Sequence, residues 1–348
     1  MTPADLPLRL TLDGTALVAN WRWLAAHGGA PAGAAIKADG YGLGASEVGR
    51  RLAEAGCRDF FVATWAEAEA LGPLVRDTSF SVLHGVREED IAAALGSRAR
   101  PVLNTAAMVA RWKAAAPGRP CDVMIDTGMN RLGLAPAEAV SGLLDGLTID
   151  LLMSHLACGD EPGNPMNERQ RREFTALAAR LPAARHSLAN SAAICMGAGY
   201  GFDLTRPGLA LYGGIPRLEA VGHIAPVIEI EAQILQVRDV AVGRTIGYGA
   251  TFTAAAPMRV AILNLGYADG YLRAFAGKGG AWMDGRRLPL VGRVSMDLIA
   301  IDIGPADLHE GDWLQVDYAL EPASMATGLS QYELLTGLGS RYQRRWTD

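Results

Sequence analysis

The chain has 348 residues, of which half are hydrophobic and 20% are charged, and its formal net charge is −5. This composition predicts a globular protein large enough for one large domain and a second, smaller one. No basic run stands out beyond "RYQRRW" near the C-terminus, so nucleic acid is not an expected partner.

The chain begins "MTPADLPLRLTLDGTAL", without a charged segment followed by an apolar one, and no stretch reaches the roughly 18 apolar residues that a membrane span needs. We therefore expect a cytoplasmic protein that does not bind a membrane. The four cysteines are widely spaced, with no CxxC pair, which predicts reduced thiols and neither disulfides nor a metal site.

Short apolar runs typical of buried strands recur through the first two-thirds of the chain. They lie at residues 32–38, 60–64, 80–85, 100–104, 121–126, 149–155, 184–190 and 209–214. Between them are stretches with helical spacing, such as 46–56 and 167–181. Eight strand–helix units of about 20–35 residues favour a parallel (β/α)8 barrel of the TIM type over an open sheet.

The pattern changes near residue 224. From there, strands rich in Val and Ile alternate with Gly, Pro and Asp turns, and helical periodicity is nearly absent until "SQYELLTGLG". We therefore predict a barrel over residues 1–223 and an all-β domain over residues 224–348.

Side chains suited to chemistry lie at the carboxyl ends of the predicted barrel strands, where a barrel places its active site, or, for Arg206 and Gly208, around the eighth strand. In chain order they are Lys37, Asp126, Arg131, His155, Asn190, Ser191, Arg206 and Gly208. Each alone has an ordinary structural explanation, since most lysines at strand ends only keep their charge in water. Together they place cationic and hydrogen-bonding groups on one rim.

The run "AAIKADGYGLGA" (34–45) ends a strand on Lys37 and continues with three glycines. Backbone N–H groups of Gly-rich turns, with Ser and Tyr hydroxyls, can hold a phosphate. A lysine with a lowered pKa can form a Schiff base with an aldehyde. Both features suit pyridoxal 5′-phosphate.

The sequence resembles the alanine racemases, pyridoxal-phosphate enzymes with a barrel followed by a β domain. The resemblance covers nearly the whole chain, through "AAIKADGYGLGA", "DTGMNRLG", "SHLACGD", "NSAA", "RPGLALYG", "GYGATF", "LGYADGY", "GRVSMD" and "YELLTGLGSRY". It implies interconversion of L-alanine and D-alanine, which supplies D-alanine for cell-wall peptidoglycan. It also implies a homodimer whose two chains share each active site.

The resemblance further implies residue roles. Lys37 would be the Schiff-base lysine and one catalytic base, and Tyr248 the other base, reaching the cofactor of the partner subunit. Tyr41, Asn190, Ser191, Gly208 and Leu209 would bind the cofactor, largely at its phosphate, with Arg206 on the pyridine nitrogen and His155 coupled to Arg206 and Tyr248. Arg131, Tyr267, Met296 and Asp297 would bind or enclose the amino-acid substrate.

The chemistry of racemisation agrees with two catalytic bases, Lys37 and Tyr248. Racemisation removes a proton from one face and returns one to the other, so it needs two bases on opposite sides of the cofactor. An arginine keeps its proton, so it would leave the pyridine nitrogen unprotonated, which disfavours transamination.

Two positions depart from the family pattern. Many relatives have a carbamylated lysine where this chain has Met124, so Arg131 needs another partner, such as Asn130 or an anion. Many also have a phosphate-binding tyrosine near the C-terminus, where counting gives Ser340 here, with Tyr342 two residues on. Tyr271 could equally be a gate or a packing residue.

Three alternatives to an alanine racemase remain. The first is a racemase of another small amino acid such as serine, because a pocket distinguishes one hydroxyl only modestly. The second is a decarboxylase of basic amino acids, whose pyridine partner would be an acid and not Arg206. The third is a non-catalytic cofactor carrier, which would lack the second domain.

Overall fold

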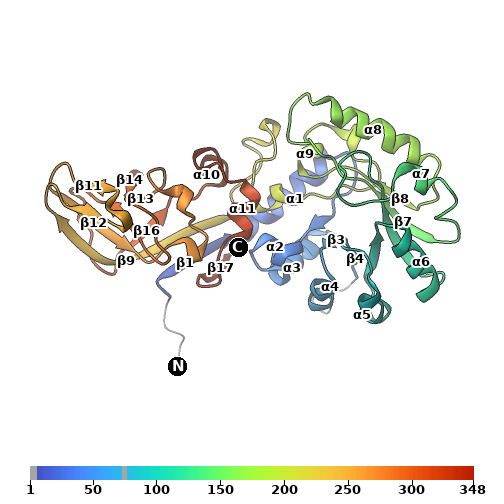
Figure 1. Ribbon diagram of the computed structural model, residues 1–348, viewed down its shortest axis with the longest axis horizontal. Helices are drawn as coiled ribbons and strands as arrows, with labels where there is room; N and C mark the ends of the chain where they lie inside the picture. The colour runs from blue at the N-terminus through green and yellow to red at the C-terminus, as the bar shows by residue number, and fades with distance from the viewer. Residues whose placement is uncertain (1–5, 73–76) are drawn as a thin grey trace. The chain divides into compact units, whose positions relative to one another are not determined.

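The computed structural model describes residues 6–72 and 77–348 (Figure 1), so the predicted start of the first domain at residue 1 lies outside the described residues. The chain divides into two compact units. The first is Ala16–Ala225, and the second combines Pro226–Asp348 with the strand β1 (Leu8–Asp13) near the N-terminus.

The first unit is built on a parallel sheet in which the strands follow chain order. Its strands are β2 (Ala34–Ala35), β3 (Asp59–Val62), β4 (Ser79–Val82), β5 (Arg100–Leu103), β6 (Pro120–Met124), β7 (Thr148–Met153) and β8 (Arg185–Ser187). Each lies within or overlaps one of the first seven predicted apolar runs. Parallel neighbours joined by helices are the repeating unit that the sequence predicted.

Helices α2 to α8 lie between these strands in the chain, α1 precedes β2 and α9 follows β8, and they lie along the outer side of the sheet (Figure 1). They are α1 (Gly14–His27), α2 (Lys37–Tyr41), α3 (Ala45–Ala55), α4 (Trp65–Leu71), α5 (Ile91–Gly96), α6 (Ala106–Ala115), α7 (Pro136–Ala139), α8 (Pro165–Ala178) and α9 (Ser191–Ile194). Local chemistry sets several starts: the Asn164 side chain accepts from Met166 N (2.9 Å), and Pro165 occupies the first turn of α8.

The eighth predicted strand is wrong, because Leu209–Tyr212 forms a short 3-10 helix, η3. A fully buried apolar run has no periodicity that separates helix from strand. Residues 203–207, just before it, form hydrogen bonds with residues at or next to both edge strands of the sheet, β8 and β2. The contacts toward β8 are Asp203 N to His186 O (3.0 Å) and Arg206 N to Ala189 O (2.8 Å), and those toward β2 are Gly33 N to Thr205 O (2.9 Å) and Ala35 N to Pro207 O (2.9 Å).

The second unit is mainly β. Its remaining strands are β9 (Ile228–Val240), β10 (Thr245–Ile246), β11 (Phe252–Thr253), β12 (Met258–Leu263), β13 (Gly280–Met283), β14 (Arg286–Val291), β15 (Ile299–Asp302), β16 (Trp313–Val316) and β17 (Gln343–Thr347). Pairings run from β9 through β12, β15, β14, β13 and β16 back to β9, so these strands form a ring. The unit also contains the helices α10 (Leu320–Thr327) and α11 (Gln331–Thr336), so it is not purely β.

β1 extends this second sheet, since it pairs antiparallel with β9 and parallel with β17. Its sequence, "LRLTLD", alternates: Leu8, Leu10 and Leu12 are buried and the residues between them are partly exposed. That period of two is typical of a strand, although the predicted strands begin only at residue 32 and do not include β1. A domain boundary drawn once along the chain, at 223/224, separates β1 from the strands it pairs with.

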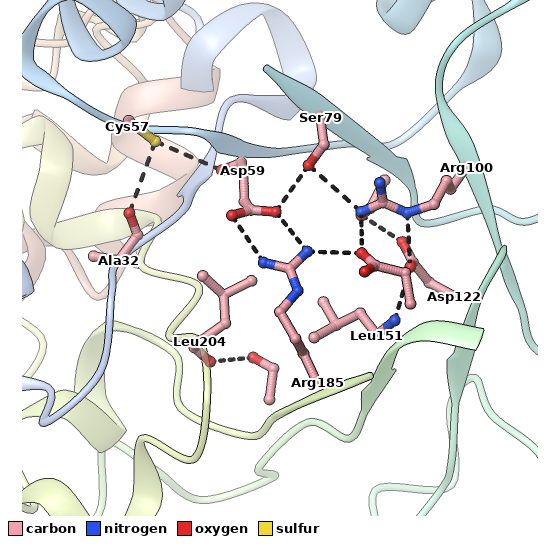
Figure 2. Close-up of polar contacts among 12 residues, drawn as sticks. Ala32, Cys57, Asp59, Ser79, Arg100, Asp122, Leu151, Arg185 and Leu204 are labelled. Carbon is pink, nitrogen blue, oxygen red and sulfur yellow. Dashed lines mark hydrogen bonds and ion pairs between the residues drawn. The ribbon is translucent and has the colours of Figure 1, made fainter. Parts of the chain in front are cut away.

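An ionic network joins the amino-terminal ends of the first unit's strands (Figure 2). Arg185 on β8 donates to both Asp59 on β3 (2.9 and 3.1 Å) and Asp150 on β7 (2.7 Å). Arg100 on β5 pairs with Asp150 (2.8 Å) and with the fully buried Asp122 on β6 (3.0 Å). Functional groups of such sheets gather at the opposite, carboxyl ends, so we assign this network to the architecture of the sheet and not to the candidate site.

Within the described segments, no helix has the length and apolar character that crossing a lipid bilayer requires.

Candidate functional site

Lys37 is the first residue of α2, two residues after β2, where the first unit's sheet begins. The next four residues turn left-handed: Ala38, Asp39 and Tyr41 have φ of 53°, 53° and 56°, and Gly40 has 61°. This conformation costs a non-glycine residue about 1–2 kcal/mol. Such strain persists only where surrounding contacts hold it, and it is frequent at active sites. The strained turn therefore marks the Lys37 segment as a candidate site.

The electrostatic surroundings connect Lys37 with three other predicted residues. Burial and the charge of Arg131 lower the pKa of the Lys37 amine. Burial, together with the charges of Arg206, Arg131 and Lys37, lowers the pKa of His155 to about 3. His155 is therefore a neutral imidazole near pH 7, and the structure brings these four residues of the first unit within electrostatic reach of one another.

Arg206 is buried and firmly held. One of its terminal nitrogens donates to the Ser187 hydroxyl and the other to the carbonyl oxygen of Ser154 (2.5 Å). Burial lowers its pKa to about 10, so it still carries its proton at neutral pH. Its guanidinium also lies 5.9 Å from the centre of the Phe61 ring. A charged, immobilised donor of this kind can direct a hydrogen bond at a ligand atom.

Tyr41, Ser191, Gly208 and Leu209 form a small cradle. The Ser191 hydroxyl accepts from Gly208 N (2.9 Å) and from Ala210 N (3.3 Å). A Cβ atom at position 208 would lie only 2.3 Å from the Tyr41 hydroxyl, so glycine is what allows this approach. Leu209 follows as the first, buried residue of η3. Hydroxyls and backbone amides at one point are suited to a phosphate.

Asn190 supports this cradle. Its side chain caps α9 by accepting from Ala193 N (3.0 Å), which orients the helix that begins at Ser191. It therefore has a structural task here, whatever it contacts in a ligand.

Arg131 is exposed in the loop after β6, and no side chain in the described segments pairs with it. Met124 is buried in β6. Asn130 does not take over the role of partner: its amide lies near Gly128 O (3.5 Å), and its φ is 56°. Asp126 instead organises the loop, since its carboxylate accepts from Gly128 N and Met129 N (both 2.8 Å).

The second unit contains the other predicted residues. Tyr248, in the short helix η5 (Tyr248–Ala250), is 73% exposed, and Met296 is 53% exposed. Tyr267 and Met296 belong to adjoining loops, because Tyr267 N donates to Ser295 O and Ala268 N donates to Met296 O (both 3.0 Å). Asp297 pairs with Arg341 (2.6 Å).

Two tyrosines of the second unit are packing residues. Tyr271 is fully buried, stacks on Phe275 at 4.1 Å and accepts a hydrogen bond from Gly280 N, which excludes the gate that the sequence left open. Tyr342 is buried and its hydroxyl donates to Asp269 O (2.8 Å). Of the two C-terminal candidates for a phosphate contact, only Ser340 is exposed.

Two supporting side chains escaped the sequence analysis. Gln170, buried on α8, donates to His155 O (3.0 Å) and Thr127 Oγ1 (3.2 Å) and accepts from Ala157 N (2.9 Å). Arg341 joins the fully buried Asp269 (2.6 and 2.7 Å) to Asp297. Neither lies at the carboxyl end of a predicted strand, the position that marked most of the predicted site residues.

The first unit can therefore supply an amine of lowered pKa, two guanidinium groups, a neutral imidazole and a phosphate cradle on one rim. This donor set fits an anionic, phosphorylated aldehyde and a carboxylate substrate. The four cysteines have free thiols, and burial raises the pKa of Cys57 and Cys121 to about 12, so these two are unreactive. The described residues contain no group of three or more His, Cys, Asp or Glu side chains that could hold a metal ion.

Comparisons with known proteins agree with this donor set. Family models described as the N-terminal and C-terminal domains of alanine racemase match residues 12–216 and 227–346. The chain is 43% identical to the alanine racemase of Acidiphilium cryptum, over 96% of this chain and 97% of that one. Among solved structures, a Bartonella henselae alanine racemase with covalently bound pyridoxal phosphate has a TM-score of 0.93 at 34% identity, covering 99% of this chain and all of that one. A biosynthetic alanine racemase from Pseudomonas aeruginosa has a TM-score of 0.91 at 33% identity, with the same coverage of both chains.

Proposed function

Because the chain belongs to the alanine racemase family, we propose that it interconverts L-alanine and D-alanine with pyridoxal 5′-phosphate attached to Lys37. The observation that carries the proposal is the set of basic side chains around Lys37, next to the cradle of Tyr41, Ser191 and Gly208. A cofactor with a phosphate and a substrate with a carboxylate would bring the anionic charge that this set lacks.

Each part of the site has a proposed task. Lys37 would hold the cofactor, the cradle with Leu209 and Asn190 would hold its phosphate end, and Arg206 would donate to its ring nitrogen. His155, neutral and close to Arg206, would keep the hydrogen-bond network around the ring in one arrangement. When bound, the cofactor delocalises the charge left on the substrate's α-carbon after proton removal.

The proton transfers need two groups. The lowered pKa of Lys37 suits it to take and return the α-proton on one face. For the other face we propose Tyr248 from the partner subunit of a homodimer, since a phenol exposed on the second unit can reach a neighbouring chain. Arg131 and the Met296 backbone N–H would hold the substrate carboxylate, with Tyr267 and Asp297 lining its entrance.

We also propose that the first unit closes into a (β/α)8 barrel, with residues 203–207 in the place of the eighth strand. The hydrogen bonds from this segment to both β8 and β2 support the closure. We place the enzyme in the cytoplasm, where its D-alanine would enter peptidoglycan synthesis.

The first experiment locates the cofactor. The purified protein is expected to absorb in the visible range, and borohydride reduction followed by peptide mapping should find the cofactor on Lys37. The chain has only two other lysines, Lys113 and Lys278, so the map is unambiguous. Cofactor on either of them refutes the site.

The second experiment tests the shared site. Lys37→Ala and Tyr248→Phe should each be inactive alone. Mixed dimers should regain activity with L-alanine, because one of their two sites holds both bases. No recovery after proven subunit exchange contradicts the supply of Tyr248 by the partner. Release of CO2 from the substrate would instead indicate a decarboxylase.

A further inference from the structure

A carboxylate without an assigned role, Glu67, lies beside the turn that carries Lys37. Glu67 belongs to α4, the helix after β3, and is partly buried. One of its oxygens accepts from the backbone N–H of Ala38, the residue after Lys37 (2.8 Å). The other accepts from Ala63 N (2.6 Å) and Thr64 N (3.3 Å). Glu67 therefore ties the loop after β2 to the loop after β3.

The turn needs such a tie. Eight non-glycine residues in the described segments have positive φ, and Ala38, Asp39 and Tyr41 are three of them. Asp39 is held by its own contact, since its carboxylate accepts from Ala45 N (2.9 Å). For Ala38, the side-chain contact is the one from Glu67. Without it, the strained peptide that follows Lys37 loses the acceptor of its N–H group.

The charge of Glu67 also acts on Lys37. The charged or titratable groups that act on Lys37 are Arg131 from the loop after β6, His155 from the loop after β7, and Glu67 from α4. Arg131 lowers the pKa of the Lys37 amine and Glu67 raises it. His155 is neutral at physiological pH, so Glu67 is the anion that offsets the guanidinium.

We propose that Glu67 is a positioning residue for Lys37: its carboxylate fixes the left-handed turn that presents the amine, and its charge offsets that of Arg131. The proposal rests on the function proposed above for Lys37. It assigns to Glu67 no contact with the substrate or cofactor.

The test compares three variants of the full-length protein. Glu67→Gln removes the charge and leaves one carbonyl oxygen where two oxygens now accept three backbone N–H groups. Glu69→Gln is the matched control, because it removes the same charge from an exposed position of the same helix. Thr64→Ala removes the other half of the cap of α4, in which Thr64 Oγ1 accepts from Glu67 N (3.3 Å), and spares the Ala38 contact.

Two measurements separate positioning from stability. After removal of the cofactor, the rate at which Lys37 becomes linked to added pyridoxal 5′-phosphate is followed by absorbance. Independently, brief acylation over a range of pH, followed by peptide mapping, gives the pH at which half of the Lys37 amine is reactive. Lys113 and Lys278 are the internal references.

At a pH above both acylation midpoints, where the Lys37 amine is neutral in both proteins, we expect the linkage rate of Glu67→Gln to fall by about tenfold or more, as misplacement of a reacting group typically does. Its acylation midpoint should move to lower pH, because the anion that raised the pKa of Lys37 is gone. Glu69→Gln and Thr64→Ala should keep the wild-type rate and midpoint, although Thr64→Ala should unfold at a lower temperature.

A linkage rate in Glu67→Gln within twofold of the wild type overturns the proposal, and so does an equal loss in Thr64→Ala. The proposed function fails in a different way, namely if wild-type cofactor maps to Lys113 or Lys278. Even then the acylation midpoint still tests Glu67, because it requires no cofactor. An unmoved midpoint in Glu67→Gln also counts against the proposal.

Discussion

Asp122, in the ionic network at the amino-terminal ends of the strands, should make the protein less stable as its carboxyl group ionises. Its side chain is fully buried and accepts from Ser81 Oγ (2.6 Å), Arg100 Nε (3.0 Å) and Leu151 N (3.1 Å). Burial outweighs the attraction of Arg100 and raises the pKa of Asp122 to about 6. Asp122→Asn removes the ionisation and keeps the shape.

The magnitude follows from the two pKa values. An unfolded Asp titrates near ~3.9, and each pH unit between that value and about 6 corresponds to ~1.4 kcal/mol. The folded state binds the proton more tightly, so the contribution of Asp122 to stability is lost as pH rises from ~4 to ~6, by about 3 kcal/mol in all. Asparagine has no such loss.

Asparagine also fits the hydrogen bonds. Its carbonyl oxygen can accept from Arg100 and Leu151, and its amide can donate to the Ser81 hydroxyl, which accepts as well as donates. Arg100 keeps its second carboxylate partner, Asp150, at 2.8 Å. The substitution therefore changes mainly the charge.

The assay is urea unfolding of both proteins at one protein concentration, at pH ~4.5 and pH ~8. The difference in unfolding free energy between Asp122→Asn and the wild type should be about 2 kcal/mol more favourable to the variant at pH ~8 than at pH ~4.5. Asp160→Asn, at an exposed position, is the control and should gain nothing. A difference between Asp122→Asn and wild type that does not change with pH would refute the reasoning.

Three further outcomes are expected. Gly208→Ala should weaken cofactor binding by at least ~10-fold and lower the unfolding free energy, measured by thermal unfolding, by about 1–3 kcal/mol, because its Cβ would lie 2.3 Å from the Tyr41 hydroxyl. The control is Gly199→Ala, where a Cβ meets open space, and it should have neither effect. Arg341→Met should cost about 2–3 kcal/mol, measured by chemical unfolding, because it strips the buried Asp269 of its partner, whereas Asp297→Asn should cost under ~1 kcal/mol. In Tyr248→Phe, the rate of proton abstraction from L-alanine should fall by about 10²–10⁴-fold, while part of the deuterium exchange of D-alanine should remain through Lys37. Equal loss of both rates, with cofactor still bound, would contradict the assignment of one base to each face of the substrate.

Much of the local order of the first unit can be read from sequence patterns. Apolar runs of four to eight residues between turn signals located β2 to β8, because a strand covered on both faces needs a continuous apolar run. The ends of those runs identified Lys37, His155 and Ser191 as candidate site residues, since the carboxyl ends of parallel strands meet at one rim. The motifs in family order identified the alanine racemase family, which the comparisons confirm.

Features that depend on residues far apart in the chain could not be predicted from local patterns. β1 finds its neighbours more than 200 residues away, in β9 and β17, and no local pattern specifies such a pairing. The buried run 209–212 became a 3-10 helix because Gly208 N and Ala210 N bond to Ser191, which the run itself does not encode. Glu67, Gln170 and Arg341 look like ordinary polar residues in the sequence, since their roles come from the backbone groups and charges that folding places beside them.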